Sequence, residues 1–140
     1  WIEENNINNK SLIDYGSGSG ILAIVAKLHG ADKVVGAEID RKAIDNAIQN
    51  CKKNDIQIPF IDLNKTSIHE KFDFLIANIL SNTLIQLSTT FKTLAKEKII
   101  LSGILDKQVP NVINAYSDWI ILKQTKNLEG WNLLEGKIIA

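Results

Sequence analysis

The pattern of apolar and polar positions along the chain predicts strands and helices in alternation. Short continuous apolar runs, typical of strands buried on both faces, predict strands at 11–15, 33–38, 56–61, 72–78, 98–102, 119–125 and 131–138. Apolar residues three and four positions apart predict helices at 19–28, 40–53, 82–95 and 106–116. This alternation is typical of α/β proteins. We therefore expect a doubly wound, seven-stranded and mostly parallel sheet with helices on both faces.

The two prolines and one polar connection refine this picture. Pro59 cannot donate to a strand ladder, so we place strand 56–61 at an edge of the sheet. Pro110 either kinks helix 106–116 or makes it start late, and the sequence leaves both open. The short polar connection 126–130 predicts that the two final strands form an antiparallel pair. The last strand of the sheet is therefore expected to be antiparallel.

A glycine-rich loop joins the first predicted strand to the first helix, in the run Asp14-Tyr15-Gly16-Ser17-Gly18-Ser19-Gly20. Glycine tolerates positive φ and has no Cβ, so main-chain N–H groups can lie against a ligand at the N-terminus of the following helix. A nucleotide-like ligand fits this geometry, and its candidate contacts are then Gly16, Ser17, Gly18 and Gly20. The alternative is that the glycines only make a tight strand-to-helix turn.

Glu38 ends the second predicted strand, about twenty residues beyond the start of the glycine loop. A carboxylate at that place can accept the hydroxyl protons of a ribose, which implies an adenosine-type cofactor. The alternatives are a solvated acid at a strand end or a charge in the first turn of a helix, and Asp40 can fill the same roles. The position after a glycine loop favours the ribose role.

Asp14, two positions before the first glycine, bears on which nucleoside binds. The run 18–23 also fits the G-x-G-x-x-A form of the dinucleotide fingerprint, so the loop alone does not decide. A carboxylate at Asp14 would repel a pyrophosphate but attract an ammonium or sulfonium group. S-adenosylmethionine is such a ligand, and its methyl group is already activated on sulfur. A carboxylate that only hydrogen-bonds the loop amides remains the alternative for Asp14.

Asn78 ends the fourth predicted strand and faces the same sheet edge as Gly16. Ligands of doubly wound sheets bind beyond the carboxyl ends of the strands. The amide of Asn78 is therefore a candidate for orienting a nucleophilic amine, while its backbone lines the cofactor pocket. In the alternative, Asn78 caps the helix that starts near Ser81.

Composition narrows the classes of partner. Sixteen basic and sixteen acidic residues balance, which gives no reason to expect direct binding to nucleic acid or to an anionic membrane surface. The apolar runs are too short to span a bilayer, and no signal peptide is visible. The single Cys51 cannot form an internal disulfide, which suits a reducing cytoplasm. His29 and His69 have no second His or Cys at ligand spacing, so we expect no metal.

The chain resembles the bacterial ribosomal protein L11 methyltransferases in segments that span nearly its whole length. These segments are the runs 12–24 and 35–40, Ala77-Asn78-Ile79-Leu80, Ser102-Gly103-Ile104-Leu105 and Gly130-Trp131. Most Rossmann-like methyltransferases share the glycine loop, whereas its combination with the later segments is more specific. The resemblance implies a Rossmann-like class I methyltransferase fold, cofactor contacts from Gly16 and Glu38, and Asn78 between cofactor and acceptor amine.

The resemblance also implies an activity. The family transfers methyl groups from S-adenosylmethionine, with S-adenosylhomocysteine as product, to lysine ε-amines and the N-terminal α-amine of a large-subunit ribosomal protein. Family members usually have Cys where this chain has Ser17 and Asp where it has Glu38, and both replacements keep a polar group. We expect a cytoplasmic monomer. Two rivals stay open: an NAD-dependent oxidoreductase, and a degenerate methyltransferase-like domain kept for protein interaction.

The first residues of the chain bear on its domain organisation. The chain begins at Trp1 and contains no Met, so we expect that an upstream segment is missing. Family members carry an N-terminal domain that binds the ribosomal protein, and a Thr-containing loop that contacts the cofactor. We expect residues 1–10 to be the end of an upstream helix and a linker, and 11–140 to be the methyltransferase domain. We therefore expect this chain alone to bind cofactor weakly and to methylate poorly.

Overall fold

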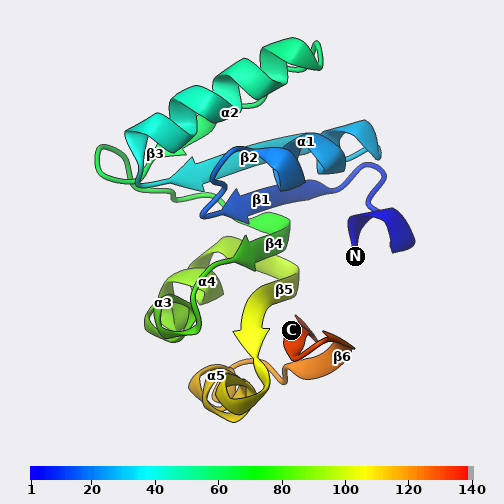
Figure 1. The fold of residues 1–140 in the computed structure, drawn as a ribbon, viewed down its shortest axis with the longest axis vertical. Coiled ribbons are helices and arrows are strands. Elements are labelled where there is room, and N and C mark those ends of the chain that lie inside the picture. Colours follow the sequence, from blue (N-terminus) through cyan, green and yellow to red (C-terminus); the bar gives the residue numbers. More distant parts are fainter. Residues whose placement is uncertain (139–140) are drawn as a thin grey trace. The chain divides into compact units, whose positions relative to one another are not determined.

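The computed structural model describes residues 1–138, which cluster into two compact units. The first unit comprises Trp1–Ile68, and the second begins at His69. Each unit has its own strands and its own helices (Figure 1). Within residues 1–138, no helix combines the length and the apolar character that crossing a membrane requires.

The first unit is a parallel sheet with two α-helices. Its elements are the 3-10 helix η1 (Ile2–Glu4), β1 (Ser11–Tyr15), α1 (Ile21–Leu28), β2 (Lys33–Glu38), α2 (Arg41–Lys53) and β3 (Phe60–Asp62). The strands lie in the order β3-β2-β1, and all of them are parallel. Helices α1 and α2 contact one another and pack against these strands (Figure 1). Because the strands are parallel, their carboxyl ends at Tyr15, Glu38 and Asp62 lie at one edge.

Strands β1 and β2 are buried on both faces, as predicted. Side chains of consecutive strand residues point to opposite faces, and the consecutive pairs Leu12–Ile13 and Val34–Val35 are all buried. Among the strands of residues 1–138, β3 pairs only with β2, and it begins directly after Pro59. The prediction of an edge strand is therefore confirmed for this unit, although the strand is shorter than expected and extends to Asp62.

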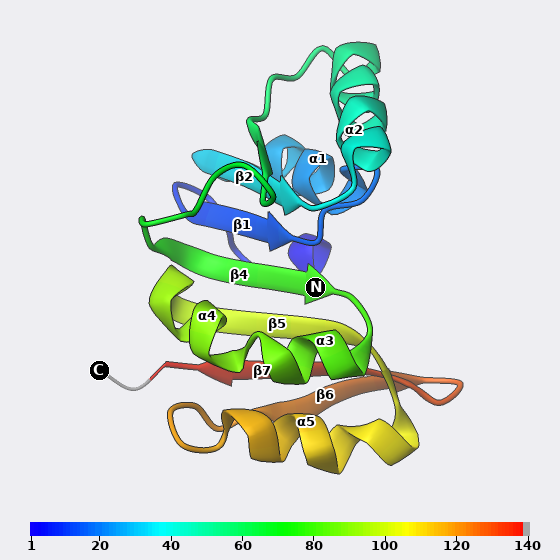
Figure 2. The same cartoon turned by 90° about the vertical axis from the view of Figure 1, so that its left-hand side faces the viewer.

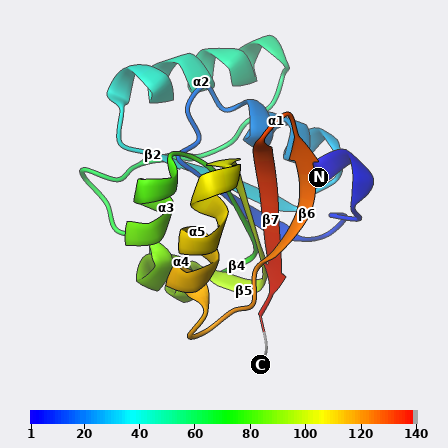
Figure 3. The same cartoon turned by 60° about the horizontal axis from the view of Figure 1, so that its bottom comes forward.

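The second unit is a mixed sheet with three α-helices. Its elements are β4 (Phe72–Asn78), α3 (Ser81–Gln86), α4 (Ser88–Leu94), β5 (Ala95–Leu105), the 3-10 helix η2 (Asp106–Gln108), α5 (Val109–Tyr116), β6 (Lys123–Leu128) and β7 (Trp131–Lys137). Strand β4 is parallel to β5, whereas β7 lies between β5 and β6 and is antiparallel to both. Helices α3, α4 and α5 lie on one face of this sheet (Figures 2 and 3). The predicted α/β fold, with mostly parallel strands and an antiparallel last strand, is confirmed.

Tyr116 is the centre of the helical layer of the second unit. Its ring is fully buried, and its hydroxyl donates to the carbonyl of Leu84 at 2.6 Å. The rings of Phe91 and Trp119 pack against it at centroid distances of 6.4 and 5.7 Å. Burial raises the pKa of the Tyr116 hydroxyl well above its usual range. This cluster holds α3, α4 and α5 together on the sheet.

Two predicted helices differ from the structure. The expected helix 82–95 is broken at Leu87. The break places Ser88 inside, where its hydroxyl donates to the carbonyl of Ala115 at 2.9 Å, and this bond favours the break. Ala95, the expected end of that helix, instead opens β5. The expected helix 106–116 starts late: Pro110 lies in the first turn of α5, where its missing N–H costs nothing.

The predicted strand 119–125 is wrong in its first half. The N–H groups of Trp119 and Ile120 both donate to the carbonyl of Tyr116, which closes a turn after α5. Ile120 and Leu122 are buried, but they lie in this loop and not in a strand. The following hairpin is confirmed as antiparallel, but its turn is only Glu129–Gly130, both with positive φ.

Candidate functional site

The glycine loop has the sharply bent backbone that its sequence predicts. Gly16, Gly18 and Gly20 all have positive φ, at 77°, 55° and 84°. The N–H groups of Gly16 and Ser17 donate to the carbonyl of Ala37 in β2, at 2.7 and 3.1 Å. The loop is therefore held against the carboxyl end of the neighbouring strand.

Gly20 shows why the end of the loop admits no side chain. A Cβ at this position would lie 3.0 Å from the Cβ of Ala47 in α2 and 3.1 Å from the ring of Phe60 in β3. Phe60 also lies against Gly36 of β2, where a Cβ would overlap the ring. One aromatic ring thus packs beneath the loop, and Gly20 brings the N-terminus of α1 close to it.

The carboxylate of Glu38 binds backbone N–H groups from two segments. Oε1 accepts the N–H of Gly18 at 2.9 Å, while Oε2 accepts those of Ile39 and Asp40 at 2.8 and 3.0 Å. An ionised carboxylate offers about four lone-pair sites, so roughly one remains for a ligand. Glu38 thus lies at the glycine loop as predicted, and it also fastens the loop to the turn between β2 and α2.

Asp14 is a buried acid without a full set of partners. The residue is 1% exposed, and the backbone N–H of Ala23 in the first turn of α1 bonds its carboxyl group. Within the described residues 1–138, its Oδ2 has no hydrogen-bond partner. Burial raises the pKa of Asp14 from 3.8 to about 7; the bond from Ala23 opposes this shift and the nearby Glu38 charge adds to it. A cation bound here would supply the charge partner that the protein itself does not.

Ser17 is the second buried polar side chain of the loop. Its hydroxyl is buried and has no hydrogen-bond partner among the described residues. Buried polar groups normally have hydrogen-bond partners, because a buried group without such a bond costs about 1–3 kcal/mol. The open bonding capacity of Asp14 and Ser17 at one loop is the pattern expected where a polar ligand completes the site.

Asn78 belongs to the second unit, where it ends β4 with an exposed side chain. Its register partner on the neighbouring strand β5 is Ser102. Its Oδ1 lies beside the α-carbon of Gly103. The alternative that Asn78 caps a helix is wrong, because α3 begins at Ser81 with Leu80 as N-cap and without a side-chain capping bond. The amide is therefore left for another role.

Sequence analysis gave no role to three residues beside Glu38. Asp62 is its register partner at the end of β3, and Ile39, the next residue along the chain, is 63% exposed. Asn64 donates from its side chain to the carbonyl of Ile39 at 2.7 Å, which fixes that exposed residue. The missed signal was the end of the third strand: a strand extended to Asp62 would have placed it at the same edge.

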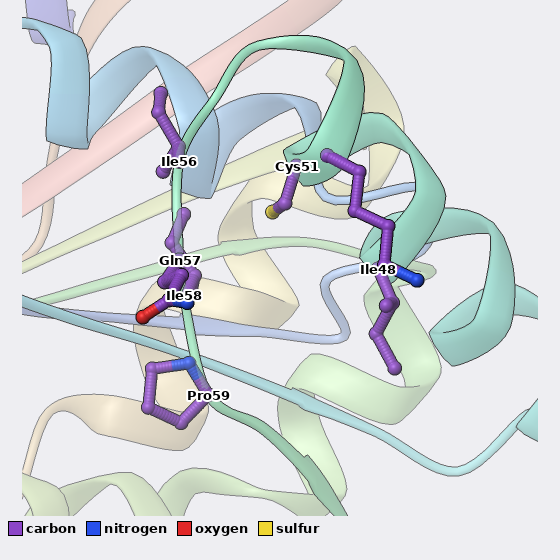
Figure 4. A pocket seen from close by; sticks show the side chains of 7 residues that line it. Ile48, Cys51, Ile56, Gln57, Ile58 and Pro59 are labelled. Carbon is purple, nitrogen blue, oxygen red and sulfur yellow. The ribbon is translucent and has the colours of Figure 1, made fainter.

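The surroundings of the remaining candidate residues indicate structural roles. Cys51 is buried on α2, and burial raises the pKa of its thiol, so it is not an activated nucleophile. It lines a pocket between α2 and residues 56–59, whose other walls are mostly isoleucine and proline (Figure 4). Within residues 1–138, no group of three or more His, Cys, Asp or Glu side chains is arranged to hold a metal ion.

The chain is similar to a family of known proteins over nearly its whole length. It matches the family model of the ribosomal protein L11 methyltransferase (PrmA) over residues 1–138. A ribosomal protein L11 methyltransferase of Cupriavidus pinatubonensis is 38% identical over 138 residues, which are 97% of this chain and 46% of that protein. The Paraburkholderia phytofirmans protein of the same name is 39% identical with the same coverage. The chain therefore spans about half the length of the curated relatives it matches.

Solved structures give the same fold class. A ribosomal protein L11 methylase from Lactobacillus delbrueckii subsp. bulgaricus matches 99% of this chain and 73% of its own, with TM-score 0.86 and 28% identity. A magnesium protoporphyrin IX methyltransferase from Synechocystis, solved with bound SAM, matches 97% of this chain and 73% of its own, with TM-score 0.75 and 17% identity. The second likeness bears on the fold alone. The predicted Rossmann-like class I methyltransferase fold is confirmed.

Proposed function

Since the chain belongs to the ribosomal protein L11 methyltransferase family, we propose that it is the catalytic domain of a protein N-methyltransferase that uses S-adenosylmethionine. The proposed acceptors are lysine ε-amines and the N-terminal α-amine of a large-subunit ribosomal protein. Residues 11–140 form this domain, and residues 1–10 end an upstream helix and linker. The chain spans about half of each relative, which supports the proposal that it corresponds to one part of those proteins.

The observation that carries the proposal is the buried carboxyl group of Asp14. Among residues 1–138 its Oδ2 has no hydrogen-bond partner, and burial raises its pKa to about 7, so its surroundings disfavour the ionised form. A ligand that carries an ammonium and a sulfonium group would supply opposite charge and so favour ionisation. Asp14 thus binds the cationic part of the cofactor, beside the loop formed by Gly16, Ser17, Gly18 and Gly20.

The edge formed by β2 and β3 suits the nucleoside part of the same ligand. Glu38 keeps roughly one acceptor site for a ribose hydroxyl after its three backbone bonds. Ile39, exposed and braced by Asn64, offers an apolar face to a base. Asp62 next to Glu38 offers a carboxylate to an exocyclic amine. These contacts are part of the proposal and extend the residues predicted from sequence.

Asn78 is the proposed catalytic residue. S-adenosylmethionine, when bound, supplies a methyl group already activated on a sulfonium sulfur. The protein then has to hold an acceptor amine in line, and orientation alone contributes a large share of such rate enhancements. The Oδ1 of Asn78 accepts an N–H of the amine and so fixes the direction of the nitrogen lone pair.

The NAD-dependent oxidoreductase remains the rival for the glycine loop. A dinucleotide would place two phosphate charges against the loop, beside the buried carboxyl group of Asp14. Two phosphate charges would oppose ionisation of Asp14, whereas a cationic ligand would favour it. The electrostatics of the loop therefore support the cationic cofactor.

Methyl transfer to the purified ribosomal protein tests the proposal. The chain is incubated with labelled S-adenosylmethionine, alone and joined behind the N-terminal half of the Cupriavidus relative, and modified sites are mapped by mass spectrometry. We expect transfer to amine nitrogens from the joined protein, little from the chain alone, and a strong loss in an Asn78→Ala control. Efficient turnover by the chain alone would overturn the domain assignment. If the joined protein binds no adenosyl ligand, the degenerate domain is the better account.

A further inference from the structure

Strand β5 carries an irregularity directly beside Asn78. Its pairing with β7 shifts register between Leu101 and Ile104, and Gly103 within this bulge has φ +83°. On the other side of β5, Ser102 is the register partner of Asn78 in β4. Bulges bend a strand locally and re-aim the side chains next to them. This bulge therefore lies where it can determine the orientation of the Asn78 side chain.

Gly103 leaves the space that the Asn78 amide occupies. A Cβ at Gly103 would lie 2.8 Å from Oδ1 of Asn78 and 3.1 Å from the carbonyl oxygen of Ile79. The first distance is shorter than any normal contact of a Cβ atom. The carbonyl of Ile79 has little freedom to retreat, because α3 begins at Ser81, two residues later. Any side chain at 103 would therefore displace the amide.

We propose that Gly103 is a positioning residue: the bulge in β5 puts a bare α-carbon against the end of β4 and so leaves the Asn78 amide free to take its place there. The inference rests on the proposed function, in which this amide orients the acceptor amine. Gly103 touches no ligand in this account and acts only through Asn78. Gly103 acts because it has no side chain.

The expected effect falls on the transfer step and not on cofactor binding. Misplacement of a catalytic group by about 1 Å costs as much as 100-fold in rate, so Gly103→Ala should slow methyl transfer about 10- to 100-fold. Gly103 is not among the residues proposed to bind the cofactor, so the dissociation constant of S-adenosylhomocysteine should stay unchanged.

Gly130→Ala is the matched control. Gly130 also has positive φ, at +87°, so alanine meets the same backbone penalty there as at Gly103. A Cβ at Gly130 would lie no closer than 3.6 Å to Oδ2 of Asp106, which is an ordinary contact. It would not reach Asn78. Comparison of the two variants separates loss of backbone freedom from displacement of the amide.

The experiment measures the amide itself by NMR on isotope-labelled chain. We expect Gly103→Ala to shift the side-chain NH₂ resonances of Asn78, and Gly130→Ala to leave them in place. Unshifted Asn78 resonances in folded Gly103→Ala would overturn the inference. Single-turnover methyl transfer by the two variants, in the joined protein described above, should then be slowed only by the Gly103 substitution. Equal slowing by both variants would also overturn it.

A double substitution keeps the test decisive if Gly103→Ala does not fold. Asn78→Ala removes the atom nearest to the new Cβ and leaves the 3.1 Å contact with the carbonyl oxygen of Ile79, so the Asn78→Ala/Gly103→Ala protein should regain a cooperative unfolding transition. If it stays unfolded, the contact with Ile79 and not the one with the Asn78 amide is decisive, and the inference fails. The NMR and unfolding readouts need no activity, so a failure of the proposed function leaves them interpretable: shifted resonances without any methyl transfer would refute the function and retain the geometry.

Discussion

The carboxylate of Glu38 accepts the backbone N–H of Gly18 at 2.9 Å, across twenty residues of sequence. The same group accepts the N–H groups of Ile39 and Asp40. A ribose with two hydroxyl groups therefore finds roughly one open acceptor site, unless it displaces Gly18. The acid at the end of β2 shapes the glycine loop, and the proposed function gives it a second task, to bind the sugar.

Substitution of Glu38 should separate these tasks. Glu38→Gln loses the charge and turns one acceptor into a donor, and bonds to a charged group are worth about 1.5–3 kcal/mol, so adenosyl affinity should fall about 10- to 100-fold. Glu38→Asp keeps the charge but is one methylene shorter, so it should weaken the bond to Gly18. We expect faster hydrogen exchange of the Gly18 amide in both variants, with the smaller loss of affinity in Glu38→Asp. Unchanged exchange at Gly18 would show that the bond does not hold the loop.

Asp14 should make the chain less stable as the pH rises. Burial raises its pKa in the folded chain to about 7 from the ordinary value of 3.8, so the folded state holds its proton more tightly. The favourable contribution is complete below pH 4 and is lost as the pH rises toward and through 7, a change of up to about 4 kcal/mol. Asp14→Asn should flatten this dependence and raise the free energy of unfolding at pH 8, measured by urea denaturation. Asp45→Asn, at an exposed helical salt bridge to Arg41, is the control and should leave the pH profile in place. Identical profiles for wild type and Asp14→Asn would refute this account of Asp14.

Cofactor affinity should show the opposite pH dependence. A cationic ligand favours ionised Asp14, and this form becomes scarce below the pKa of about 7. The affinity for S-adenosylmethionine should therefore fall as the pH is lowered, approaching about tenfold per pH unit. Titration calorimetry at several pH values between 5.5 and 8 measures the slope. A slope that persists in Asp14→Asn would assign the dependence to another group.

Asn78→Ala should impair catalysis more than binding. The substitution keeps the backbone of β4 and removes only the amide, so single-turnover methyl transfer should slow about 100-fold while cofactor affinity changes little. Asn82→Ala, on the exposed surface of α3, is the control and should transfer at the wild-type rate. A normal transfer rate in Asn78→Ala would exclude the amide from the reaction.

The parts of the fold that sequence predicted well have strong local signals. Strands β1, β2 and β4 begin and end where the apolar runs do, and alternate glycines mark the positive φ angles of the loop. The break at Leu87 carries no glycine or proline, and it depends on where Ser88 finds its partner in α5. Residues 119–122 are as apolar as a strand, but the N–H groups of Trp119 and Ile120 bond to the carbonyl of Tyr116 at the end of α5. Tertiary packing decided both cases.

The candidate site was predicted in position but not in bonding. The spacing of Asp14 and Glu38 from the loop placed both acids at the edge where the first strands end. That Glu38 bonds Gly18, and that Oδ2 of Asp14 has no partner, depends on the folded dihedral angles of the loop. The role of Gly103 depends on a strand bulge for which the sequence offers only a glycine.

Calorimetric titration of the chain at pH 8 with S-adenosylmethionine, S-adenosylhomocysteine and NAD tests the central claim most directly. The account predicts heats of binding for both adenosyl ligands, of low affinity in this chain, none for NAD, and a weakened response to S-adenosylmethionine in Asp14→Asn. Binding of NAD in preference to the adenosyl ligands would contradict it.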